Sequence, residues 1–162
     1  MLSNIGNTLI ILNILVTLII IYSSHLSLKN QEVKISKKIY DLSLAQSTIS
    51  IVTFFVLITG FIVSDFSLIT VFQNSHIDKP LFYKISGTWG NHEGSLLLWI
   101  NVLVLFSYFF LILNKKTLKN YRLSTLIIQN FLIFVFFFKF ITNTISICGM
   151  FKTFWSFFIC IP

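Results

Sequence analysis

The sequence predicts an all-α integral membrane protein with about four transmembrane helices and one long outer loop that carries the candidate functional residues. Two observations predict this class. Hydrophobic residues make up 56% of the chain and charged residues only 10%, and the apolar residues gather in four long runs. So few charged side chains cannot cover the apolar surface of a soluble domain of 162 residues.

Each apolar run is close to the roughly 20 residues that cross the hydrocarbon core of a bilayer. The predicted spans are residues 5–22, 44–63, 95–113 and 123–143. A helix satisfies its own backbone hydrogen bonds in lipid, so helices are expected despite the many β-branched and Phe residues. The first run lacks the basic flank and cleavage site of a signal peptide, so we expect a permanent helix.

The chain thus divides into a membrane domain, residues 1–144, and an apolar tail, residues 145–162. The tail is compatible both with a fifth span and with a helix lying at the membrane surface. Ser, Thr and Asn side chains are sparse within the spans. We expect them to help pack exposed helix faces against a partner chain in lipid.

The basic residues between the runs predict the orientation. Four lie between the first and second runs and four between the third and fourth: Lys29, Lys34, Lys37, Lys38, Lys115, Lys116, Lys119 and Arg122. Loop 64–94 has only Lys79 and Lys84, offset by three acidic residues. Because basic loops stay inside, loop 64–94 is expected on the outer face. This distribution accounts for the net charge of +7, so no nucleic-acid partner is expected.

Polar residues gather just before the third run, in the stretch W-G-N-H-E-G-S-L-L-L-W from Trp89 to Trp99. Glu93 and Ser95 fall where the helix is predicted to begin, next to unpaired backbone N–H groups and the positive helix end. Gly90 and Gly94 are expected to permit a tight turn into that helix.

His92 stands seven residues before Trp99, so both are expected on one helix face at the outer boundary. Two interpretations stay open: an aromatic belt with a helix cap, or a polar and aromatic ledge for a flat hydrophobic ligand. A zinc-protease helix is excluded because Leu96 stands where the second His is required. Cys148 and Cys160 match no metal or haem-attachment spacing, so no metal site is predicted.

The stretch from Asp65 to Trp99 resembles the outer loop of the CcmF family, the haem-lyase component of the System I cytochrome c maturation pathway. It includes the continuous pattern K-P-L-F-Y-K-I-S-G-T-W-G-N-H-E-G-S-L-L-L-W. The matching positions are Phe66, Ser67, Val71, Asn74, Ser75, Pro80, Tyr83, Lys84, Trp89, Gly90, His92, Glu93, Gly94, Ser95 and Trp99. Helix order extends the resemblance over roughly residues 1–144.

The resemblance implies a subunit of a cytochrome c haem lyase, which helps to position haem and apocytochrome c for covalent attachment. It implies a b-type haem in the assembled complex, with ligands outside this chain, and a haem chaperone as a further partner. The family's later tryptophan-rich haem-handling segment and its H-P-P segment have no counterpart here. We therefore expect a separate chain to carry them, and this chain to be a non-catalytic part of the lyase.

The chain contains 19 Phe and one Ala, a bias typical of AT-rich codons. With the resemblance, this bias suggests a split mitochondrial member, in the inner membrane, with loop 64–94 facing the intermembrane space. The competing hypothesis is a small structural subunit of a respiratory complex, or a transporter fragment, with no haem role. Composition, span number and charge bias fit it equally well, and only the loop pattern separates the two.

Overall fold

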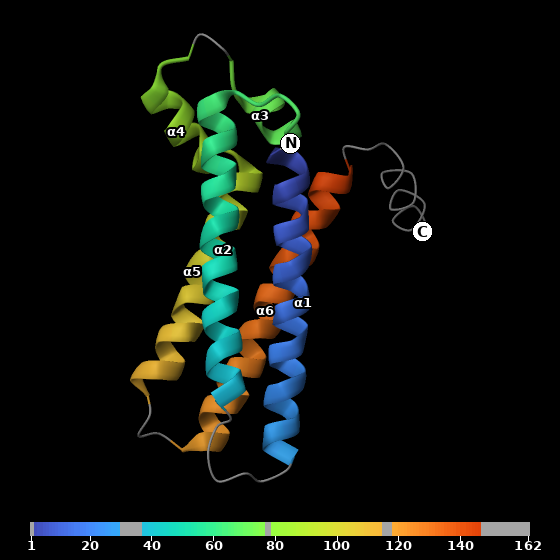
Figure 1. Ribbon diagram of the computed structural model, residues 1–162, viewed down its shortest axis with the longest axis vertical. Coiled ribbons are helices and arrows are strands. Elements are labelled where there is room, and N and C mark those ends of the chain that lie inside the picture. Colours follow the sequence, from blue (N-terminus) through green and yellow to red (C-terminus); the bar gives the residue numbers. More distant parts are fainter. Residues whose placement is uncertain (1, 30–36, 77–78, 115–117, 147–162) are drawn as a thin grey trace, which may run out of the picture.

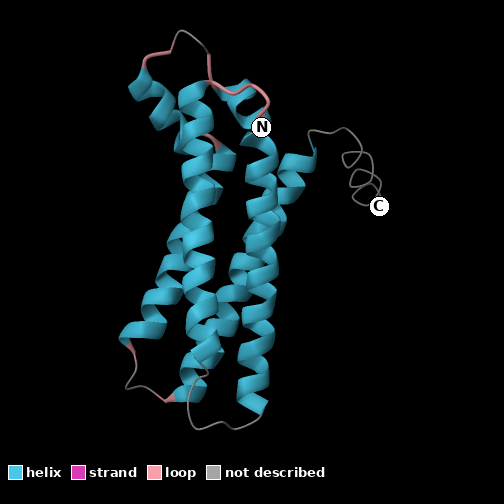
Figure 2. Ribbon diagram, in the orientation of Figure 1, coloured by secondary structure: helices cyan, strands magenta, loops and turns pink. Residues whose placement is uncertain are grey.

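The computed structural model describes residues 2–29, 37–76, 79–114 and 118–146, apart from the side chains of Ser3, Ile69 and residues 142–146. Nearly all of the predicted tail, residues 145–162, lies outside this description, as do both cysteines. The described residues form six helices and no strand (Figure 2). Four of these helices are long and apolar enough to cross a membrane, which confirms the predicted all-α membrane fold.

The four long helices extend beyond the predicted apolar runs. They are α1 (Leu2–Lys29), α2 (Lys37–Val63), α5 (His92–Leu113) and α6 (Lys119–Ser146). Helical hydrogen bonding continues past the hydrocarbon boundary, where charged side chains at the helix ends can meet water and headgroups. The apolar runs therefore located the four long helices, but the helices are longer than the runs.

The long helices form an up-and-down bundle in which chain neighbours run antiparallel (Figure 1). α1 packs against α2 and α6, and α5 packs against the same two helices. One apolar cluster lies toward the end that holds the N-terminus and includes Ile10, Ile100 and Phe137. A second, toward the opposite end, is formed by Ile39, Leu111, Leu123 and Leu126. The end of α1, the start of α2, the end of α5 and the start of α6 are at this opposite end (Figure 1).

Several polar side chains of the spans face the interior of the bundle, where they are buried against helices of the same chain rather than available to a partner chain. Asn13, Thr17, Gln46 and Asn130 are all almost fully buried between the helices. The exposed face of α1 instead carries apolar residues such as Leu15 and Ile19. In lipid the solvent is apolar, so polar side chains are better placed against other helices of the bundle.

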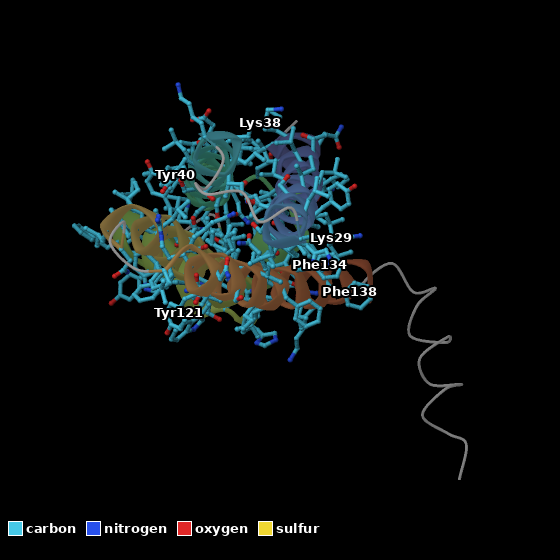
Figure 3. All side chains as sticks on the ribbon, turned by 90° about the horizontal axis from the view of Figure 1, so that it is seen from below. Lys29, Lys38, Tyr40, Tyr121, Phe134 and Phe138 are labelled. Atoms are coloured by element: carbon cyan, nitrogen blue, oxygen red, sulfur yellow. The ribbon has the colours of Figure 1, made fainter. Side chains whose placement is uncertain are left out.

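The end of the bundle opposite the N-terminus carries most of the basic residues, and we call it the basic end. Arg122, which was predicted to lie in a loop, is a buried cation at this end. It belongs to the first turn of α6 and is only 5% exposed. Its guanidinium donates to the hydroxyl of Tyr40 on α2, at 2.7 Å, and to the carbonyl of Leu111 on α5. Lys119 Nζ donates to the carbonyl of Ser27 at the end of α1, at 3.2 Å. Figure 3 shows this end from below, with Lys38 and Tyr40 on α2 and Lys29 on α1.

Candidate functional site: a helical cap at one end of the bundle

The predicted outer loop, residues 64–94, is largely helical in the structure, and we call this segment the cap. It contains two short helices, α3 (Ile69–Asn74) and α4 (Leu81–Gly90), and the first turn of α5. α4 packs against α2 and α5, and both short helices lie at the N-terminal end of the bundle (Figure 1). These helices have only six and ten residues, too short for the apolar-run criterion that located the spans, and they were not predicted.

The end of α2 is shaped by Ser64, which adopts a left-handed backbone conformation with φ 56°. The Ser64 N–H donates to Phe61 and the Asp65 N–H donates to Gly60, the two bonds that commonly end a helix. Glycine usually occupies this position. A serine at this position contributes a hydroxyl that glycine lacks, and this hydroxyl accepts a hydrogen bond from Lys84 Nζ of α4 at 2.7 Å. The family-motif lysine therefore fixes α4 to the end of α2.

The turn that follows α2 is stabilised by an ionised carboxylate. The Ser67 N–H donates to Asp65 Oδ1 at 3.1 Å. Hydrogen bonds from the side chain and backbone of Ser67 lower the pKa of Asp65 below its ordinary value. The folded state thus favours the ionised form, so the stabilisation is present at neutral pH and is lost as the pH falls through the pKa of Asp65.

Helix α3 is attached to the start of α5 by a hydrogen bond from the Thr70 hydroxyl to the Glu93 carboxylate. Val71 belongs to α3, and its side chain is fully buried. Glu93 lies in the first turn of α5, where its charge also favours the positive helix end. The glutamate of the family motif therefore has a structural role within the cap, whatever else it contacts.

The residue that caps α5 is Asn91, not Glu93 or Ser95 as predicted. Its side-chain oxygen accepts from the Gly94 N–H at 2.5 Å, and its amide donates to the Gly87 carbonyl of α4 at 2.9 Å. The Ser95 hydroxyl points back and donates to the His92 carbonyl instead. Asn is among the preferred residues at this position, so the signal was present in the sequence.

The two glycines that were predicted to permit a tight turn have unequal roles in the structure. A Cβ atom at Gly94 would overlap the carbonyl oxygen of Thr88, because the end of α4 and the start of α5 approach that closely. A Cβ atom at Gly90 would meet nothing within 4 Å. Gly94 is therefore required by the close contact of two backbones, and Gly90 is not.

The accessible surface of the cap is rich in aromatic side chains. Phe66 and Phe72 pack edge to face with ring centroids 6.5 Å apart, and both are exposed, as are Phe82 and Tyr83 at the start of α4. Pro80 precedes α4 and accepts the first hydrogen bond of the helix, from Tyr83.

The motif itself adds two exposed indoles and an imidazole to this surface. Trp89 is 45% exposed and Trp99 is 61% exposed, and His92 is also exposed at the start of α5. Since His92 and Trp99 are seven residues apart on one helix, they share a face, as predicted.

Two further family-motif residues lie at the end of α3. Asn74 is exposed, and its amide donates to the Thr70 carbonyl at 2.9 Å. The next residue, Ser75, is buried, and its N–H donates to the Val71 carbonyl at 2.8 Å.

The described residues contain no group of three His, Cys, Asp or Glu side chains that could hold a metal ion. Their three histidines are divided between the two ends of the bundle. His76 and His92 belong to the cap and are exposed, while His25 is exposed near the end of α1, at the opposite end. The cap exposes the aromatic side chains of Phe66, Phe72, Phe82, Tyr83 and Trp89 and the imidazoles of His76 and His92. Such side chains can contact a flat apolar molecule with polar edges.

The chain is similar to known proteins in sequence and in fold. No protein-family profile matches the chain. The cytochrome c-type biogenesis protein ccl1 of Rhodobacter capsulatus is 52% identical over 64 residues, which are 40% of this chain and 10% of that protein. CycK of Rhizobium meliloti is 44% identical over 77 residues, 48% of this chain and 11% of that protein.

CcmF of Escherichia coli is 49% identical over 47 residues, 29% of this chain and 7% of that protein. The solved structure of "Cytochrome c Heme Lyase CcmF" superposes with a TM-score of 0.75 at 22% identity, covering 85% of this chain and 23% of that one. The chain thus matches about a tenth of the length of these curated relatives and has the fold of part of CcmF. These matches identify it as a homologue of the CcmF family of cytochrome c-type biogenesis proteins.

Proposed function

We propose that the chain is part of a cytochrome c haem lyase, in which the cap helps to position haem and apocytochrome c for covalent attachment of haem. One observation carries the proposal: a homologue of the cytochrome c-type biogenesis proteins exposes Trp89 and His92 on the cap and Trp99 on the adjoining part of α5. Aromatic faces can stack against the porphyrin ring, and an imidazole can contact its polar edge. The cap supplies orientation in this proposal, and the axial ligands of the b-type haem lie outside this chain.

The remaining components are those that the resemblance to the cytochrome c-type biogenesis proteins implies. We propose that a separate chain supplies the tryptophan-rich haem-handling region, that a haem chaperone delivers haem, and that this chain is a non-catalytic part of the assembly. The AT-type composition, with 19 Phe, supports a location in the mitochondrial inner membrane.

Replacement of His92 by alanine is expected to lower the amount of mature cytochrome c by about tenfold, a loss of about 1.4 kcal/mol of interaction. His92 is exposed, so its removal leaves the packing of the cap intact while removing a contact to haem. The measurement is covalent haem in cytochrome c, by haem staining of cells that carry only the variant chain.

Two variants make that result interpretable. Phe106→Leu changes an exposed residue in the middle of α5 and should leave maturation unchanged. Glu93→Gln keeps an acceptor for Thr70 and tests the charge alone. Wild-type levels of mature cytochrome c in both His92→Ala and Trp89→Ala would contradict a role in positioning haem. They would favour the other interpretation of the motif, in which its residues form only a helix N-cap and an aromatic belt.

We further propose that the cap faces the intermembrane space and that the basic end faces the matrix, as the charge distribution indicates. In a chain with Cys148→Ser and Cys160→Ser, a cysteine at exposed Gln73 should react with a membrane-impermeant maleimide added to intact mitoplasts. A cysteine at exposed Asn120 should react only after the membrane is opened. Labelling of position 120 but not 73 in intact mitoplasts would reverse the orientation.

A further inference from the structure

Polar side chains are buried at mid-depth in the bundle, between its two apolar clusters. Along α6, the buried Asn130 lies between Leu126 of one apolar cluster and Ile133 of the other. Asn13 and Gln46, at comparable depth on α1 and α2, are each only 1% exposed. The candidate haem surface is at the cap, so this polar layer is a separate feature of the protein.

One part of this layer is a hydrogen-bonded network that joins three helices. The Gln46 amide on α2 donates to Thr17 Oγ1 on α1 at 2.9 Å and to Asn130 Oδ1 on α6 at 3.0 Å. The Thr17 hydroxyl donates in turn to the Asn13 carbonyl at 2.8 Å, and the Asn130 amide donates to the Leu126 carbonyl at 2.9 Å. Both amide hydrogens of Gln46 are therefore used, and this network has little capacity to serve further polar groups.

One turn closer to the cap, polar groups lie in the same interior without partners. Asn13 is one turn from Thr17 along α1, and Ser50 is one turn from Gln46 along the antiparallel α2, so the two share a layer. Both side chains are 1% exposed. Among the described residues, the Asn13 amide nitrogen and oxygen and the Ser50 hydroxyl have no hydrogen-bond partner.

Unpartnered polar atoms at this depth are costly. Each buried donor or acceptor without a partner costs about 1–3 kcal/mol, and the surrounding lipid offers none. Asn13 contributes two such side-chain atoms and Ser50 one. A chain would not retain an asparagine there unless something satisfied it.

We infer that this layer binds ordered water, held by Asn13 and Ser50 in the interior of the bundle. The occupant has to both donate and accept, because the Asn13 side chain offers both kinds of group and the Ser50 hydroxyl can act as either. It has to be neutral, since none of the buried side chains that form this polar layer is charged. Water meets both conditions, and buried water in proteins makes about three hydrogen bonds to groups of this kind.

The direct test is transfer of magnetisation from water to side chains, measured by solid-state NMR on the full isotope-labelled chain in phosphatidylcholine bilayers. The Asn13 side-chain amide and the Ser50 Cβ should gain signal at mixing times as short as those of exposed His92. The methyl groups of Ile133 and Ile20, which are fully buried, should gain signal only at long times. In Asn13→Leu the rapid transfer to Ser50 should be lost.

Each outcome decides the inference without reference to haem. Transfer to Asn13 as slow as transfer to Ile133 would mean a dry interior, with Asn13 satisfied by a direct bond to Ser50 or another side chain, and would overturn it. Transfer to Asn13 could be rapid in the wild-type chain while transfer to Ser50 stays rapid in Asn13→Leu. The water would then not depend on Asn13, and this result would also contradict the inference. Neither measurement depends on whether the chain belongs to a haem lyase.

Discussion

Gly94→Ala is expected to destabilise the protein by about 3 kcal/mol or more and to abolish cytochrome c maturation. The added methyl group would overlap the backbone carbonyl of Thr88. A backbone group cannot rotate away as a side chain can, so α4 has to move from the start of α5. That movement also strains the Asn91 hydrogen bonds to Gly87 and Gly94. The unfolding temperature in detergent and the level of mature cytochrome c are the measurements.

Gly90→Ala is the matched control, since Gly90 belongs to the same motif. A methyl group there meets nothing within 4 Å, and Gly90 is the last helical residue of α4, so alanine should be neutral or slightly stabilising. Equal damage from both substitutions would show that glycine flexibility, rather than the close approach of α4 and α5, is what the motif requires.

Arg122→Ala is expected to cost about 2–4 kcal/mol, because one side chain connects three helices at the basic end. Its loss leaves the Leu111 carbonyl and the Tyr40 hydroxyl without their donor. The contact of the guanidinium with the Tyr40 ring, 5.9 Å from its centroid, is lost as well. Thermal unfolding of the purified chain in detergent measures the effect.

Lys38→Gln removes the same charge from the same end and serves as the control. Lys38 is exposed near the start of α2 (Figure 3), so its loss should barely change the unfolding temperature. Arg122→Lys should fall between the two, because an ammonium keeps the charge but not the planar, forked geometry of the guanidinium. If all three variants unfold at the same temperature, the basic residues of this end act only through orientation in the membrane.

The spans could be predicted because the bilayer imposes a strong and simple rule on sequence. Twenty apolar residues form a helix whatever their individual preferences, and the distribution of lysines indicated that the two basic loops share one side. The bounds could not be predicted, because helices such as α1 and α6 continue into polar surroundings where hydropathy carries no signal.

The shared helix face of His92 and Trp99 could be predicted from the sequence, but the architecture of the cap could not. Exposure of His92 and Trp99 on one face followed from helical periodicity. The contacts of Glu93 with Thr70 and of Lys84 with Ser64 join residues about twenty positions apart, and no local pattern indicates them. The role of Gly94 likewise depends on the distance between two helices, which a single sequence does not give.

The buried polar layer had a signal that was interpreted incorrectly. Asn13, Thr17, Ser24 and Ser27 recur at helical spacing on α1, and all are buried. The same pattern would arise if they faced a separate partner chain, so the sequence alone could not decide between an internal and an external surface. The structure decides because Thr17 accepts a hydrogen bond from Gln46 of the same chain.

The central claim is that this chain serves covalent haem attachment to cytochrome c. It is tested most directly by depleting the chain in the cells that make it and measuring covalent haem in their c-type cytochromes. The proposal predicts that mature cytochrome c falls while apocytochrome c persists, and that re-expression of the wild-type chain restores it. Unchanged covalent haem after full depletion would contradict the proposal and leave the chain as a structural membrane subunit.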